Sequence, residues 1–529
     1  MKNLSLSIGL LAAIGLASAA EPARLTYPIV DSGQDRCFSN TQEIAYPAEG
    51  ADFYGQDAQY QGLQPSYKDN GDGTISDLNT GLMWVKTPDL KNKTTFAEAI
   101  AGAKTCRVGG HDDWRLPTIK ELYSLIDFRG GCGRTVAQST PYIDTRYFDF
   151  VFGDETKGER IIDAQYWSAT EYLGKTMRNN ATTFGVNFAD GRIKGYPNKL
   201  IMQRGAGHQF VRYVRGNPKY GINDFADNGD GTVTDRATGL TWMKADSDKP
   251  MNWQAALKYA EELKLAGKDD WRLPNAKEMQ SIVDYTRAPE PTDPKAKKGP
   301  AIDPIFTMTN PEAWYWTGTT HQEGHTCGMA IYLCVGKGMG AMQGVKMDVH
   351  GAGAQRSDPK AGDPKIWASG NGPQGDQVRI LNYVRCVRGG DVVKKTTSPK
   401  LDGTYTAGRD RPAPGGMGMQ GPGGMGQGGM QGPGGMGQGG MGQGGMQGPG
   451  GMGPGGMQGP GGMRQGGGQM GPGGGMGAAG FIKRLDKNGD GKVSRDEFDG
   501  PPDRFGDFDR NGDGFVTADE APAAPPRRN

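Results

Sequence analysis

At 529 residues the chain is long enough for several domains, each with its own hydrophobic core. The formal net charge is only +1, so the chain as a whole is not predicted to bind nucleic acid or another polyanion. Its 89 glycines exceed average usage and are unevenly placed, which predicts one low-complexity segment.

The first twenty residues have the features of a signal peptide. Lys2 supplies the positive charge, residues 4–16 supply the apolar stretch, and Ala17-Ser18-Ala19 fits cleavage after small residues. The apolar stretch is short for a bilayer span, and no later segment is apolar enough. We therefore expect an exported protein without a transmembrane segment, located in the periplasm, at the cell surface or outside the cell.

Two copies of one sequence pattern follow. Residues 69–84 read DNGDGTISDLNTGLMW, and residues 227–242 read DNGDGTVTDRATGLTW. Three more landmarks recur in the same order: DDWRLP at 112–117 and 269–274, YW-(S/T)-x-T at 166–170 and 315–319, and R-x-VRG at 212–216 and 385–389. Domain-sized copies are the better interpretation, since the period is too long for solenoid repeats. We expect duplicated domains to double a binding surface rather than an active site.

Local signals within each copy predict two capped helices. The predicted caps are Thr95 with Glu98, Thr118 with Glu121, Asn252, and Asn275 with Glu278. The first helix is expected over about 95–106. The second helix of each copy is expected to bury Ile119, Leu122, Leu125 and Ile126, or Ala276, Met279, Ile282 and Val283. The remainder is aromatic, glycine-rich and short-stranded, which predicts an α+β class with two helices on irregular antiparallel strands.

Composition divides the chain into five segments. They are a signal peptide (1–20), a first copy with an N-terminal lead (21–216), a second copy (217–392), a Gly/Met-rich linker (393–478) and a small tail (479–529). Twelve of the 24 methionines lie between residues 417 and 476. We expect the linker to be disordered, because so glycine-rich a chain cannot offset its ordering entropy. An alternative is that its thioethers bind Cu(I).

The tail carries two sequences typical of EF-hand calcium loops. Positions 1, 3 and 5 offer side-chain oxygens, position 7 a backbone carbonyl, position 9 a ligand often reached through water, and position 12 a bidentate carboxylate, with glycine at position 6. The predicted Ca²⁺ ligands are Asp486, Asn488, Asp490, Lys492, Ser494 and Glu497, and Asp509, Asn511, Asp513, Phe515, Thr517 and Glu520. We expect a small α-helical EF-hand pair whose loops meet through Val493 and Val516. Its flanking helices are short, which favours a structural or buffering role over a switch.

The DNGDG runs of the two copies do not fit the calcium pattern. When their glycines are aligned on it, position 1 becomes Lys68 or Ala226 and position 12 becomes Asn79 or Ala237. We expect β-turns there instead.

Six cysteines in an exported chain predict disulfides, with the pairing left open. Cys327 and Cys334 are close enough in sequence to close a local loop. No C-x-x-C pair is present, so a zinc knuckle or a thioredoxin-like site is not predicted. The six are Cys37, Cys106, Cys132, Cys327, Cys334 and Cys386.

The four landmarks together resemble the Lcl C-terminal domain family, formerly called DUF1566, over most of residues 67–389. The resemblance implies two tandem C-type-lectin-like domains and an exported recognition role, because the family's namesake is a bacterial collagen-like adhesin that binds sulfated glycans. It supplies no catalytic residue that maps onto this chain. The long regular collagen segment of the namesake is also missing.

The matched tryptophans and arginines are predicted to be mainly structural. Trp114 and Trp271 are expected in the core, with Arg115 and Arg272 paired to acidic groups or carbonyls. For Trp167 and Trp316, core positions are favoured over glycan stacking. Of the closing arginines Arg212, Arg215, Arg385 and Arg388, strand alternation places Arg212 and Arg215 on opposite faces, one of them in a buried ion pair.

Enzyme signatures are poor, since no Gly-x-Ser-x-Gly elbow, Walker loop or dinucleotide fingerprint occurs in a strand–helix context, and we predict no catalytic residues and no enzyme. His321, His325 and Cys327 are a weak candidate metal site. The predicted function is an exported calcium-binding protein whose duplicated domains recognise a glycan or surface polymer, as an adhesin does. A local basic patch at Lys295, Lys297 and Lys298 is a candidate contact. The alternatives are a copper-handling protein, an enzyme with a fold like that of the formylglycine-generating enzyme, and a scaffold without a ligand.

Overall fold

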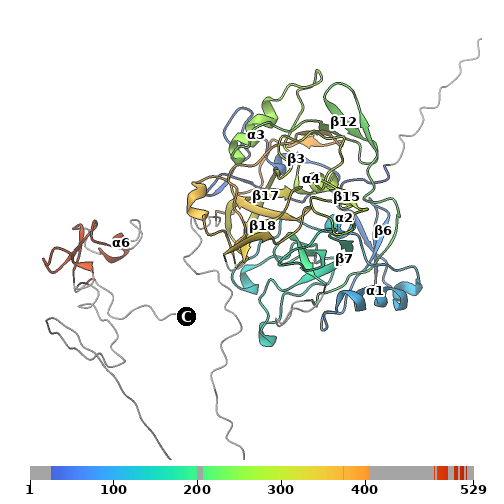
Figure 1. Ribbon diagram of the computed structural model, residues 1–529, viewed down its shortest axis with the longest axis horizontal. Helices are drawn as coiled ribbons and strands as arrows, with labels where there is room; N and C mark the ends of the chain where they lie inside the picture. Colours follow the sequence, from blue (N-terminus) through green and yellow to red (C-terminus); the bar gives the residue numbers. More distant parts are fainter. Residues whose placement is uncertain are drawn as a thin grey trace, which may run out of the picture. The chain divides into compact units, whose positions relative to one another are not determined.

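Strands rather than helices make up most of the regular structure (Figure 1). The computed structural model describes residues 25–198, 207–342, 344–372, 374–403 and 405, and in the tail 482, 485–498, 505–509, 513–517 and 520. The predicted signal peptide and most of the predicted linker lie outside the described residues. The chain divides into two compact units, within residues 1–429 and 430–529, and the first unit contains both repeats.

A small antiparallel sheet opens and closes each repeat. In repeat 1 the order is β10-β6-β5-β4, and in repeat 2 it is β11-β12-β13-β21. The strands are β4 (Tyr67–Asp69), β5 (Thr74–Asp77), β6 (Leu82–Val85) and β10 (Val214–Gly216), then β11 (Phe225–Asp227), β12 (Thr232–Asp235), β13 (Leu240–Met243) and β21 (Val387–Gly389). The first and last landmarks of each repeat are therefore hydrogen-bonded neighbours.

The DNGDG runs form the tight turns of these sheets, as predicted. Gly71 and Gly73 have φ angles of 77° and 87°, which glycine adopts without strain. Asp69 accepts the Gly71 N–H at 2.9 Å and pairs with Lys86 at 2.6 Å. The aspartates are thus used within the hairpin.

In its described residues each repeat has one α-helix of ten residues and one of six, and their predicted caps are confirmed. The helices are α1 (Phe96–Thr105), α2 (Ile119–Ser124), α3 (Trp253–Glu262) and α4 (Ala276–Ser281). Capping boxes join Thr95 with Glu98, Thr118 with Glu121, and Asn275 with Glu278, while Asn252 caps α3. The apolar residues predicted on the second helices are buried.

One six-stranded antiparallel sheet runs through both repeats in the order β16-β17-β20-β9-β8-β7. Repeat 1 contributes β7 (Gln165–Glu171), β8 (Thr182–Asn187) and β9 (Arg192–Pro197). Repeat 2 contributes β16 (Trp314–Glu323), β17 (Thr326–Cys334) and β20 (Gln355–Pro359). The halves meet where Gln355 of β20 pairs with Ile193 of β9. The repeats therefore share one sheet and one hydrophobic core.

Short strand pairs complete this unit. They are β1 (Cys37–Phe38) with β2 (Glu43–Ile44), β3 (Tyr60–Gln61) with β22 (Val393–Lys394), β14 (Arg287–Ala288) with β15 (Lys297–Lys298), and β18 (Met339–Met342) with β19 (Val345–Asp348). The pairing of β3 with β22 ties the segment after repeat 2 to the N-terminal lead. Among the described residues, no helix is both long and apolar enough to cross a membrane.

The predicted fold class is therefore wrong, because the structure is β-rich. The helices were located correctly, but they are short, and the segments expected to be irregular strands join into one extended sheet. The predicted α-helical EF-hand pair fails for the same reason. The described tail contains a two-stranded contact between β23 (Val493–Ser494) and β24 (Phe515–Val516), with α6 (Phe505–Phe508) only four residues long.

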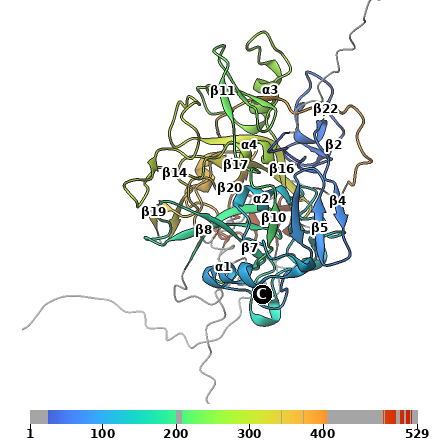
Figure 2. The same ribbon diagram turned by 90° about the vertical axis from the view of Figure 1, so that its right-hand side faces the viewer.

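Two lysines exchange hydrogen bonds between the repeats at α2 and α4, which lie side by side near the centre of both views (Figures 1 and 2). Lys120 of α2 donates to the Ser281 carbonyl at the end of α4, at 2.7 Å. Its counterpart Lys277 donates to the Ser124 carbonyl at the end of α2, at 2.9 Å. Both lysines are buried, and burial lowers the pKa of each to about 8. Each helix thus has its terminal carbonyl satisfied by the other repeat.

Replacing Lys277 with methionine is expected to destabilise the whole repeat unit. The carbonyls of Asp31 and Ser124 would lose a buried donor, at a cost of about 2–4 kcal/mol in the free energy of unfolding. Urea unfolding of the full chain, followed by tryptophan fluorescence, measures the loss. Lys258→Met on the exposed face of α3 is the control, with an expected change below about 0.5 kcal/mol. Equal stability of the two variants would contradict the structural role of Lys277.

Candidate functional site

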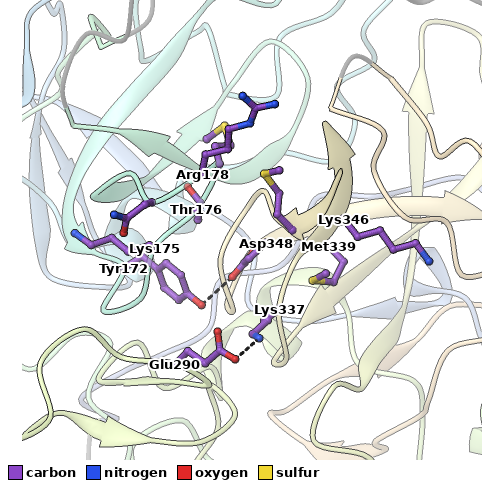
Figure 3. A pocket seen from close by; sticks show the side chains of 12 residues that line it. Tyr172, Lys175, Thr176, Arg178, Glu290, Lys337, Met339, Lys346 and Asp348 are labelled. Carbon is purple, nitrogen blue, oxygen red and sulfur yellow. Dashed lines mark hydrogen bonds and ion pairs between the residues drawn. The ribbon is translucent and has the colours of Figure 1, made fainter. Parts of the chain in front are cut away.

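A pocket of about 420 Å³ lies between the two repeats (Figure 3). Repeat 1 contributes the loop 172–179 that follows β7. Repeat 2 contributes Glu290, Lys337 and the β18–β19 hairpin. Neither repeat could form this pocket alone.

The loop from repeat 1 has an unusual backbone. Met177, Arg178 and Asn179 have φ angles of 44°, 66° and 86°, although none of them is glycine. Such residues cost about 1 kcal/mol or more each and persist only where the surroundings hold them. Here the Met177 N–H donates to the Asp348 carbonyl of β19 at 2.9 Å. The strained loop is therefore fixed against the hairpin of repeat 2.

Cations outnumber acids around the pocket. Its four basic residues are Lys175, Arg178, Lys337 and Lys346, and its two acidic residues are Glu290 and Asp348. Lys337 pairs with Glu290 at 2.6 Å. Lys175 and Lys346 lie on opposite sides of the pocket, and within the described part of the chain neither forms an ion pair (Figure 3). Two positive charges thus flank the opening.

The acidic residue deepest in the site is Asp348. Tyr172 donates its hydroxyl to Asp348 Oδ2 at 2.9 Å, and the Gly351 N–H donates to Oδ1 at 2.8 Å. Burial raises the pKa of Asp348 to about 6 despite these hydrogen bonds. A shift to slightly acidic pH therefore removes one negative charge from the pocket.

The matched tryptophans lie in the core and not in the pocket. Trp167 and Trp316 are fully buried, and their indole N–H groups donate to the carbonyls of Thr94 and Met251, each at 2.9 Å. Trp114 and Trp271 are also buried. The core interpretation is confirmed, and glycan stacking on Trp167 or Trp316 is excluded in this structure.

The arginines after these tryptophans fix the start of the second helices. Arg115 makes two hydrogen bonds to Glu121, and Arg272 makes two to Glu278. The same glutamates close the capping boxes. Each pair therefore joins the DDWRLP landmark to its helix, as predicted.

The closing arginines point to opposite faces, as strand alternation predicts. The ion pair, however, is formed by the more exposed arginine of each repeat and not by the buried one. Arg212 is buried and donates to the carbonyls of Val85 and Asp149, each at 2.6 Å. Arg385 makes the equivalent contacts with Met243, Lys244 and Thr307. The exposed partners Arg215 and Arg388 pair instead with Asp113 and Asp270.

None of the six cysteines forms a disulfide in the structure. Cys327 and Cys334 begin and end the same extended part of β17, which places them about 23 Å apart at about 3.3 Å per residue. The predicted local loop between them is therefore wrong. Within the described residues, no group of three or more His, Cys, Asp or Glu side chains is arranged to hold a metal ion. The weak site at His321, His325 and Cys327 is not formed, and His321 is bonded to the Asp190 carbonyl at 2.8 Å.

The tail loops show the contact predicted between Val493 and Val516, which pair in β23 and β24. Of the twelve predicted ligands, Asn511 lies outside the described residues. Glu497 accepts the N–H groups of Lys487, Asn488 and Ser494, each at 3.0 Å. These hydrogen bonds, led by that from Ser494, lower the pKa of Glu497 to about 2. The residues of the first loop thus fold around the carboxylate at position 12, and in the second loop the Thr517 N–H donates to Glu520 at 3.0 Å.

Both repeats match a single family model. Residues 73–215 and 231–349 match the model of the Lcl C-terminal domain. No curated protein matches the chain. The two Lcl segments include the walls of the pocket, from Tyr172 to Asn179 and from Glu290 to Asp348. The structure extends the second repeat beyond its Lcl match, because β20 and β21 complete its sheets.

Sequence reasoning missed the pocket because its residues have no counterpart between the Lcl repeats. The offset between the copies grows from 149 residues at the YW landmark to 173 at the closing arginines. This larger insertion in repeat 2 contains β18 and β19. The one sequence signal was the patch at Lys295, Lys297 and Lys298, which is exposed on the loop that follows Glu290.

Replacing Asp348 with asparagine is expected to stabilise the protein above pH 6. A raised carboxyl pKa means that ionisation costs stability as pH rises from about 4 to 6, the interval between the unfolded and folded pKa values. The variant should be about 1–2 kcal/mol more stable than wild type at pH 8, and the difference should vanish below pH 4. Urea unfolding at several pH values tests this. A pH-independent difference would contradict the assigned ionisation.

Proposed function

We propose that the two Lcl domains form an exported recognition module that binds an anionic glycan or surface polymer in the pocket they share. The observation that carries the proposal is the placement of Lys175 and Lys346 on opposite sides of a cavity large enough for a sugar residue. Carboxylate or sulfate groups on adjoining residues of a polymer would reach both charges.

The other features of the pocket fit binding rather than catalysis. The strained loop at Met177 to Asn179 holds its wall in one conformation, which lowers the entropic cost of binding. Lys337 is already neutralised by Glu290, so the charges that remain for a ligand are at the rim. Lys297 and Lys298 of β15, exposed and shortly after Glu290 in the chain, would extend the contact along a polymer.

Reversing the two rim charges is expected to abolish binding of an acidic glycan. The double variant Lys175→Glu/Lys346→Glu should bind an immobilised sulfated or uronic-acid polysaccharide at least about tenfold more weakly than wild type. It replaces two attractive charges at the exposed rim with two repulsive ones, a loss of about 1.4 kcal/mol or more. Surface plasmon resonance with the full chain provides the affinity, and a neutral polysaccharide serves as the reference ligand.

Lys264→Glu is the matched control, because Lys264 is exposed and does not line the pocket. Lys264→Glu changes the net charge by two units and the double variant changes it by four, so all affinities are compared at one low and one high ionic strength. Undiminished binding by the double variant would exclude the pocket as the polymer site.

A second proposed activity is calcium binding by the tail loops, favoured by the β23–β24 contact and by the loop geometry around Glu497. Asp486 accepts the Gly491 N–H at 2.8 Å, and Asp509 accepts the Gly514 N–H at 2.9 Å. Both bonds wrap the first ligand position around the glycine at position 6. A bound Ca²⁺ would recruit the position-12 carboxylates in competition with their present hydrogen bonds.

Calorimetric titration of the full chain is expected to show about two Ca²⁺ ions bound. Glu497→Gln/Glu520→Gln should lose both, because an amide offers one neutral oxygen where the loop needs a bidentate carboxylate. Asp496→Asn is the control, since Asp496 is acidic, adjacent and outside the ligand positions. Calcium binding that survives the double substitution would refute the loop assignment.

A further inference from the structure

Charged side chains are buried where the repeats join in the six-stranded sheet. β9 and β20 pair there through Ile193 and Gln355, and the Gly195 N–H donates to the His350 carbonyl at 3.0 Å. Six side chains gather around this junction, and none of them lines the pocket described above. We call them the seam cluster: Asp190, Lys194, Tyr196, His350, Arg356 and Asp376.

Pairs within the cluster use only part of its hydrogen-bonding capacity. Lys194 pairs with Asp190 Oδ2 at 2.8 Å, and Arg356 pairs with Asp376. His350 Nε2 lies 2.9 Å from Asp376 Oδ1. Burial lowers the pKa of His350 to about 4, so at neutral pH its Nε2–H donates and its Nδ1 carries a lone pair.

Several atoms of the cluster are buried without a hydrogen-bond partner. They are Asp190 Oδ1, Tyr196 Oη, His350 Nδ1, and Nε and Nη1 of Arg356. An unmet buried polar atom costs about 1–3 kcal/mol, and native proteins leave few of them. The side chains of Lys194 and Arg356 remain 15% and 13% exposed, so the cluster lies at the edge of the buried region.

The buried atoms without a hydrogen-bond partner determine which ligand chemistry the cluster could bind. Arg356 and the remaining ammonium protons of Lys194 require acceptor oxygens. Asp190 Oδ1 and His350 Nδ1 instead require a hydrogen-bond donor. The Tyr196 hydroxyl can either donate or accept a hydrogen bond. Arg192 also contacts Asp190 Oδ2 at 3.3 Å, but its charge is balanced by Glu323. The other two cations and two carboxylates leave the cluster without net charge, so selection depends on directed hydrogen bonds. A small oxyanion that retains one O–H group satisfies both kinds of atom.

We propose that the seam cluster is a binding site for free hydrogen phosphate. Its oxygens accept hydrogen bonds from Arg356, Lys194 and Tyr196, while its remaining O–H donates to Asp190 or His350. Sulfate has the same size and shape but no proton at neutral pH, so its oxygen would face the lone pairs of Asp190. The site thus distinguishes hydrogen phosphate from sulfate by the single O–H hydrogen that only hydrogen phosphate carries.

Calorimetry of the full chain in a phosphate-free buffer at neutral pH tests this site. One phosphate per chain is expected, with sulfate bound at least about tenfold more weakly. Arg356→Gln should weaken phosphate binding about tenfold or more, and Tyr196→Phe about fivefold. Lys264→Gln is the control and should leave the affinity unchanged. Lys175→Glu/Lys346→Glu should also leave it unchanged, which separates this site from the polymer pocket.

Three outcomes would overturn the proposal. They are no phosphate binding at millimolar concentration, equal affinity for sulfate and phosphate, or unchanged affinity in Tyr196→Phe. The tyrosine variant removes only one hydroxyl and decides the matter if Arg356→Gln does not fold. In the first case, ordered water fills the cluster.

Discussion

The exchange of lysines between α2 and α4 is the contact on which the arrangement of the repeats depends. Both helices have only six residues, too few to be stable alone, and each ends at a serine whose carbonyl lacks a partner within its own helix. Lys120 and Lys277 supply those partners from the opposite repeat. A buried ammonium at a helix C-terminus also interacts favourably with the helix dipole. Each second helix is therefore complete only when both repeats are present.

This mutual dependence explains why the polymer pocket is built from unequal parts. Once the repeats form one unit, the loop after β7 faces the β18–β19 hairpin, and these elements are not equivalent. Duplication here supplies two different walls for one pocket rather than the same surface twice. Recognition through the pocket therefore requires both repeats together. This differs from two independent binding domains, each of which would bind a ligand alone.

Local features of the sequence were sufficient to predict much of the local structure. The caps at Thr95, Thr118 and Asn275 depend on residues three apart, and the DNGDG turns depend on five adjacent residues. The burial of Trp167 and Trp316 followed from their size and chemistry. The shared sheet did not follow, because Ile193 and Gln355 pair across 162 residues and no local pattern encodes that register. The pocket was equally hidden, since Lys175 and Lys346 lie in segments that the two copies do not share.

The junction of the sheet shows how such a pairing is specified. β9 and β20 share a single ladder pair, so backbone hydrogen bonds alone would fix their register only weakly. Arg192 of β9 reaches across to Glu323 of β16 at 2.5 Å and to Ser357 of β20 at 3.1 Å. A register shift of one residue would turn these charged side chains to the other face and leave them unpaired in the core. Because unpaired buried charges are far more costly than paired ones, the contacts of Arg192 select one register even where their net contribution to stability is small.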